Sequence, residues 1–279
     1  MVHPQIAAFA RLANGSAKPV RKLEGAATLL GRTMHSIEYD PIHDEFSVPV
    51  PLSGAILTFR GDANGEESPI RVIQGSQTQI ESPSRLGLDP VHNEIYVPQG
   101  RKIMVYPREA NGNVAPIRVL EGPDTKLGAG AVAIDTIHDL LIAVGGLGGG
   151  GGEGEGRSQI LIFDRMASGN TKPKSIISGP KTMLTSTGGP FTIYPPKGKI
   201  LVPIRGAITT NAMFAPDSFV GVWNITDNGD VPPQWTIGGP RGAFEMVRGV
   251  TLNPKYKEVI VSDKRLNAVL TFSFPALFE

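Results

Sequence analysis

The sequence repeats itself, and this repeat restricts the fold more than any other feature. A glycine that closes the segment RVIQG, or its equivalent, recurs every 47 to 60 residues, at Gly25, Gly75, Gly122, Gly179 and Gly239. Self-similarity at such a period predicts a fold built from successive supersecondary units. One unit reads SRLGLDPVHNEIYVP (Ser84–Pro98) and continues as KIMVYPREANGNVAPIRVLEG (Lys102–Gly122).

Each unit contains four short apolar runs, which turn residues separate. Runs of this length, rich in Val, Ile, Leu and aromatic residues, predict β-strands, here named a, b, c and d in chain order. Some strands are apolar on successive residues, as in Ile103–Tyr106, which indicates that both faces are covered. The c–d connection carries Asn-Gly in most units, and this pair supplies the positive φ that a tight hairpin needs.

Antiparallel four-stranded sheets that are covered on both faces and repeated are typical of a β-propeller. We therefore predict an all-β fold, a single propeller domain over residues 1–279. The sequence contains five a, five b, six c and five d strands, which favours five blades. Six blades are the alternative. The N-terminal and C-terminal strands are expected to close the ring, and the surplus c strand (Ile6–Arg11) either adds to the closing blade or displaces the C-terminal c strand.

The segments LGLDPVHNEIYVP and KIMVYPREANGNVAPIRVLEG resemble NHL-type β-propeller repeats, especially those abundant in bacterial proteins. The resemblance extends over nearly the whole chain. It implies a propeller fold and a bacterial source, and it implies almost nothing about function. The expected count of five blades departs from the better-known NHL proteins.

Composition excludes several classes of protein. The net charge of +1 argues against binding to nucleic acid through bulk charge. With 40% hydrophobic and 19% charged residues, the chain has the composition of a soluble globular protein. The absence of cysteine excludes disulfides and thiolate chemistry. No apolar run is long enough to span a membrane, and no signal peptide precedes the repeats, so the chain is cytoplasmic as written, or secreted or periplasmic if a leader was removed.

In this topology the d–a and b–c loops share one face of the ring, and this face is rich in arginine. Guanidinium groups bind carboxylate and phosphate with two parallel hydrogen bonds, so arginines that converge at the channel mouth predict an anionic ligand. Ordinary solvated or blade-bridging arginines are the alternative. The seven candidates are Arg32, Arg85, Arg101, Arg205, Arg241, Arg248 and Arg265.

The same face carries weak candidates for a metal site, namely His35, Glu38 and Asp263, which a closed ring would place in neighbouring blades. No local metal-binding motif supports them, and a polar channel lining is the alternative interpretation. A serine hydrolase motif is also absent, and no cofactor is predicted. Two long insertions lie on this face, at Gly145–Gly156 and Gly206–Phe219, and the apolar residues of the second predict a contact with a partner or pocket.

A histidine recurs in the a–b turns on the opposite face, in DPIHDEFSVP, DPVHNEIYVP and DTIHDLLIAV. This recurrence indicates that His43, His92 and His138 are turn residues. The sequence thus predicts a ligand-binding or protein-binding scaffold whose contacts lie on the d–a and b–c face. The alternative is an enzyme at the channel mouth, of the metal-assisted lyase or lactonase type.

Overall fold

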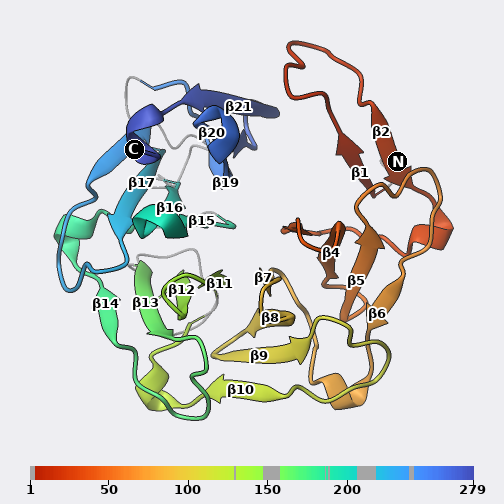
Figure 1. Ribbon diagram of the computed structural model, residues 1–279, viewed down its shortest axis with the longest axis horizontal. Coiled ribbons are helices and arrows are strands. Elements are labelled where there is room, and N and C mark those ends of the chain that lie inside the picture. The colour runs from red at the N-terminus through yellow and green to blue at the C-terminus, as the bar shows by residue number, and fades with distance from the viewer. Residues whose placement is uncertain are drawn as a thin grey trace, which may run out of the picture. The chain divides into compact units, whose positions relative to one another are not determined.

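The computed structural model describes residues 4–128, 130–146, 158–185, 187, 189–205, 218–238 and 242–279. Within these ranges every helix or strand is either a β-strand or a single turn of 3-10 helix (Figure 1). The prediction of an all-β chain is therefore confirmed. In this part of the chain no helix is long and apolar enough to cross a membrane.

Four sheets have four strands each, and their strands follow one another in the predicted order a, b, c, d. The first two sheets are β3 (Glu38–Asp40), β4 (Glu45–Val50), β5 (Ala55–Arg60) and β6 (Arg71–Ile73), then β7 (Gly87–Asp89), β8 (Glu94–Gln99), β9 (Lys102–Pro107) and β10 (Arg118–Glu121). The next two are β11 (Gly130–Asp135), β12 (Leu140–Gly146), β13 (Ser158–Asp164) and β14 (Ser175–Ile177), then β15 (Thr192–Tyr194), β16 (Lys199–Ile204), β17 (Phe219–Asn224) and β18 (Trp235–Gly238).

A fifth sheet holds the last a, b and c strands, which are β19 (Val247–Asn253), β20 (Glu258–Asp263) and β21 (Ala268–Ser273). The N-terminal c and d strands, β1 (Gln5–Ala8) and β2 (Arg21–Glu24), form a two-stranded sheet. The predicted blades are therefore confirmed strand by strand. Closure of the ring by the N-terminal and C-terminal strands stays a prediction.

The apolar residues of the inner strands are buried on both faces of their sheet. In β16, Ile200 and Val202 pack into a core shared with the β11–β14 blade. Leu201, on the opposite face of the same strand, packs into a second core shared with the β19–β21 blade. Neighbouring blades thus bury one another, which explains why these strands are apolar on successive residues rather than alternately.

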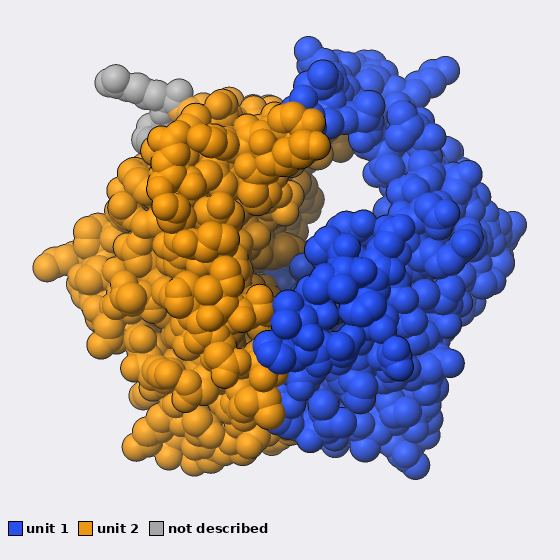
Figure 2. Space-filling view, in the orientation of Figure 1, with its two compact units in different colours: residues 1–99, 104–118 blue, residues 100–103, 119–279 orange. Residues whose placement is uncertain are grey.

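The chain divides into two compact units, residues 1–99 with 104–118 and residues 100–103 with 119–279 (Figure 2). The division falls inside β9 and β10 and so does not follow a boundary between blades. The single domain over residues 1–279 stays a prediction.

Candidate ligand-binding surface

The candidate arginines differ in exposure. Arg32, Arg101 and Arg265 are exposed, whereas Arg85, Arg205 and Arg248 are partly buried. Arg241 lies outside the described residues. Arg265 belongs to an ion pair, with 2.9 Å between its Nε and Oε2 of Glu245. Arg32 and Arg85 lie in the first unit. The second unit contains Arg101, Arg205, Arg248 and Arg265.

The first unit brings Arg32 and Arg85 onto adjoining segments through a contact between His35 and Ser84. Nδ1 of His35 lies 2.9 Å from Oγ of Ser84, although 49 residues separate them in the chain. His35 belongs to the d–a connection between β2 and β3, and Ser84 to the d–a connection between β6 and β7. The contact therefore ties the d–a connections of two neighbouring blades together. Sequence reasoning missed Ser84, because no local motif marks a serine whose partner lies in another blade.

Glu38 lies on β3, three residues after His35. Burial raises the pKa of its carboxyl from 4.5 to about 8, and the hydrogen bond from the Ser36 hydroxyl acts in the opposite direction. Most of this carboxyl is therefore protonated and uncharged at neutral pH. In that uncharged state Glu38 is a poor ligand for a metal ion.

Asp263, the third weak metal candidate, holds two loops of the second unit in place. Its Oδ2 accepts hydrogen bonds from the main-chain N–H groups of Glu245 and Met246, at 2.8 and 2.9 Å. Its Oδ1 accepts two more, from Arg265 and Leu266, both at 3.0 Å. Both carboxylate oxygens are thus engaged by the protein itself. Among the described residues, no group of three or more His, Cys, Asp or Glu side chains is placed to hold a metal ion.

In the first unit Gln99 holds a loop in place, as Asp263 does in the second. It ends strand b of its blade, as Asp263 ends strand b of the last blade. Its Oε1 accepts the main-chain N–H groups of Glu81 and Ser82, and its Nε2 donates to the carbonyl of Gln79. Comparison of the repeats could have found this role, because Gln99 and Asp263 occupy the same position at the end of strand b.

The last apolar residue of the second insertion does not contribute to the predicted contact with a partner. Phe219 begins β17 and is buried in the core shared by the β11–β14 and β15–β18 blades. Met213 and Phe214 lie outside the described residues, as do residues 147–156 of the glycine-rich insertion.

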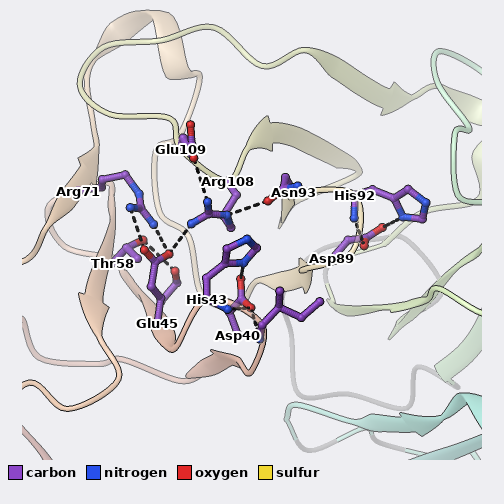
Figure 3. A network of polar contacts seen from close by, with 12 residues as sticks. Asp40, His43, Glu45, Thr58, Arg71, Asp89, His92, Asn93, Arg108 and Glu109 are labelled. Carbon is purple, nitrogen blue, oxygen red and sulfur yellow. Dashed lines mark hydrogen bonds and ion pairs between the residues drawn. The ribbon is translucent and has the colours of Figure 1, made fainter.

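On the opposite face the recurring histidines are turn residues, as predicted. In Asp89–His92, Oδ1 of the aspartate accepts the main-chain N–H of the histidine at 2.9 Å, and Oδ2 lies 2.8 Å from its Nδ1 (Figure 3). Asp40 with His43 and Asp135 with His138 repeat this arrangement. These aspartates are buried, so their carboxylates serve to close the a–b turns.

Beside these turns, Glu45 is held by arginines from two blades (Figure 3). Arg71 of the same blade donates to Oε1 at 3.1 Å, and Arg108 of the next blade donates to Oε2 at 2.8 Å. Burial opposes the charge of Glu45, but the hydrogen bonds and positive charges of Arg71 and Arg108 outweigh it and hold the pKa below its ordinary value. Arg118 and Glu94 form the matching pair within the second blade. These ion pairs join strands within a blade and, through Arg108, two neighbouring blades.

Comparisons with known proteins place the chain by its fold. No protein family model and no curated protein matches its sequence. Its structure is similar to the crystal structure of the β-propeller domain of Cps50 (Swd1) from Myceliophteria thermophila, with a TM-score of 0.54. The match covers 88% of this chain and 67% of that chain, at 10% sequence identity. The fold is a β-propeller. At this identity the likeness says nothing about function.

Proposed function

We propose that this propeller is a binding scaffold for an anionic group, a carboxylate or phosphate on a small ligand or on a partner protein. The observation that carries the proposal is the contact between His35 and Ser84. It ties together two d–a connections, of which one carries Arg32 and the other Arg85. A cationic and hydrogen-bonding surface built from two blades suits the recognition of an oxyanion.

The charge balance of this surface supports the same function. Glu38, the acid on the adjoining strand, is largely uncharged at neutral pH because burial raises its pKa to about 8. On the opposite face, by contrast, Glu45 is paired with Arg71 and Arg108. An incoming anion therefore meets less repulsion on the d–a side, where arginine is exposed at Arg32.

The resemblance to NHL-type repeats extends this proposal to a bacterial protein that presents its loops to a partner. The contacts are expected on the d–a and b–c face, which carries the remaining candidates Arg101, Arg205, Arg241, Arg248 and Arg265. Rigid blades that present variable loops are a common basis for binding sites. Nucleic acid is not an expected partner, given the net charge of +1, and no insertion into a membrane is expected, because no apolar run is long enough.

Titration calorimetry with inorganic phosphate, sulfate and citrate tests the binding of anions. We expect at least one of them to bind, and Arg32→Ala combined with Arg85→Ala to weaken binding by about tenfold or more. Lys18→Ala is the matched control, because Lys18 is an exposed cation of the same unit outside the d–a connections. If none of the anions binds, or if Lys18→Ala weakens binding equally, the proposal is wrong.

The alternative function, an enzyme at the channel mouth, has one observation in its favour. The imidazole of His35 lies within hydrogen-bonding distance of the Ser84 hydroxyl, so it is placed to take up a proton from it. Hydrolysis of a panel of lactones, with and without a chelator, tests this function. Activity that Ser84→Ala or His35→Ala abolishes would favour the enzyme, and activity that only the chelator abolishes would favour the metal-assisted type.

A further inference from the structure

Asn-Gly pairs occupy four of the c–d turns, and three of these pairs are bonded to a neighbouring blade. The four pairs are Asn14-Gly15, Asn64-Gly65, Asn111-Gly112 and Asn228-Gly229. In the last three, the glycine N–H donates to a main-chain carbonyl of strand d in the preceding blade. The acceptors are Lys22 for Gly65, Val72 for Gly112 and Ile176 for Gly229, at 2.6 to 2.7 Å.

The asparagine side chains of these three pairs are bonded to the same strands. Oδ1 of Asn111 accepts the main-chain N–H of Val72 at 2.9 Å. Asn64 and Asn228 accept the equivalent N–H groups, those of Lys22 and Ile176. The side-chain amide and the glycine nitrogen of each pair are therefore engaged by separate main-chain partners, and both are released only when the two hairpins separate.

The first pair, in the β1–β2 hairpin, is arranged differently. The main-chain N–H of Gly15 donates to Oδ1 of Asn14 at 2.8 Å, so the two groups of the pair contact each other. Both residues are exposed. Gly15 has φ of +60°, and nothing lies within 4 Å of the position of an added Cβ. The side-chain amide of Asn14 therefore lies beside the nitrogen of Gly15 at an uncrowded turn that water reaches.

This contact has a chemical consequence, because an asparagine side chain can react with the main-chain nitrogen that follows it. Once a hydroxide ion removes the N–H proton, the nitrogen of Gly15 can attack Cγ of Asn14. The N–Cγ bond forms, the Cγ–Nδ2 bond breaks, and the amide nitrogen takes a proton from water and leaves as ammonia. The product is a succinimide, which glycine favours because it has no Cβ to crowd the ring. Proximity of the two groups lowers the entropic part of the barrier.

We propose that Asn14 is a site of spontaneous deamidation in the folded protein. Water opens the succinimide at either of its carbonyl groups and yields aspartate or isoaspartate at this position. Both products carry a carboxylate in place of the neutral amide. Isoaspartate also adds a carbon atom to the main chain between β1 and β2, so the turn of this hairpin lengthens. Asn64, Asn111 and Asn228 share the dipeptide and are protected by their hydrogen bonds to strand d.

Incubation of the folded protein at mildly alkaline pH, followed by tryptic digestion and mass spectrometry, tests the proposal. Trypsin places Asn14, Asn64 and Asn111 in different peptides, since lysine and arginine residues separate them. We expect deamidation at Asn14 to be at least about tenfold faster than at Asn64 or Asn111. The same chain in concentrated urea is the matched control, because unfolding releases all three pairs and their rates should then become similar.

The products report the route, because peptides with aspartate and with isoaspartate separate by chromatography. A mixture of the two would support attack by Gly15, whereas aspartate alone would mean direct hydrolysis by water and would overturn the proposal. Equal rates at Asn14 and Asn111 in the folded protein would also overturn it. So would a preference for Asn14 of the same size in urea, because the geometry of the hairpin would then not be its cause. None of these results depends on whether an anion binds to the d–a surface.

Discussion

Arg108 of the second blade donates a hydrogen bond to Glu45 of the first, with 2.8 Å between Nη1 and Oε2. Both side chains are largely shielded from water, with 11% and 13% of their surface exposed. Removal of Arg108 leaves the shielded carboxylate of Glu45 with Arg71 as its one remaining ion-pair partner among the described residues. This makes the contact between blades more important for stability than an ion pair on the surface.

Replacing Arg108 with alanine should lower the free energy of unfolding by about 2 kcal/mol. Urea denaturation followed by circular dichroism measures the loss. Arg60→Ala is the matched control, because Arg60 is 56% exposed and pairs with Glu67 at the surface, so its loss of stability should be clearly smaller than that of Arg108→Ala. Equal losses in the two variants would contradict this role of Arg108.

Acid should lower the free energy of unfolding, partly because Glu45 becomes protonated. Its pKa is held below the ordinary value of 4.5 by Arg71 and Arg108, against the effect of burial. The stability that these contacts supply is present above pH 4.5 and is lost as the pH falls through the pKa of the folded state. Glu45→Gln should therefore flatten the acid limb of a plot of unfolding free energy against pH. An acid limb with the same slope as in the natural chain would rule this out.

Glu38 should have the opposite effect, so that its contribution to stability falls as the pH rises. Its folded-state pKa of about 8 lies above the ordinary 4.5, so the folded chain keeps a proton that the unfolded chain releases. Its contribution to stability is complete below pH 4.5 and declines as the pH rises towards 8. Glu38→Gln should gain stability relative to the natural chain between pH 5 and pH 9, whereas exposed Glu81→Gln should not. A carbon-13 NMR titration that places the Glu38 pKa near 4.5 would refute the prediction.

Gly75 should tolerate substitution less well than Gly100. Gly75 has φ of +130°, and a Cβ there would lie 2.5 Å from Oδ1 of Asn113, in the c–d turn of the next blade. Gly100 has φ of +60° with nothing within 4 Å of an added Cβ, so alanine there should cost only about 1 kcal/mol for the left-handed backbone. The midpoint of thermal unfolding should fall further for Gly75→Ala. Similar midpoints would show that Asn113 moves aside at little cost.

Substitutions at Asp89 and His92 test which of the two side chains stabilises the a–b turn. Asp89→Ala should cost about 2 kcal/mol, because its buried carboxylate accepts the main-chain N–H of His92 and contacts the imidazole. His92→Ala should cost less than about 1 kcal/mol, since it leaves the hydrogen bond to the main chain intact. Chemical denaturation of both variants gives the comparison. A loss for His92→Ala as large as that for Asp89→Ala would mean that the imidazole itself holds the turn.

The strands of this chain were predictable because their signal is local. Apolar runs, Asn-Gly pairs and the histidine of the a–b turn all recur within a few residues of each other, so counting them predicts the blades. The contact between His35 and Ser84 was not predictable, because its partners are 49 residues apart and lie in the d–a connections of different blades.

The role of the Asn-Gly pairs was predicted only in part. Sequence reasoning explains the positive φ of the glycine, as at Gly112 with φ of +79°. It does not explain why asparagine precedes it, because the hydrogen bond that Asn111 accepts comes from Val72 in another blade. The hydrogen bonds of Asp263 likewise had no local signal in the sequence, because its four main-chain partners belong to two loops.

The hydrogen bonds between successive c–d hairpins also bear on how a repeated chain of this kind can grow. The β5–β6 hairpin bridges the preceding strand d through Gly65, which pairs with Leu23, and is itself bridged at Ile73 by Gly112 of the next blade. The hydrogen bonds at these bridges join main chain to main chain, so they ask little of the side chains. A duplicated repeat therefore brings with it both halves of the contact that joins it to the next one.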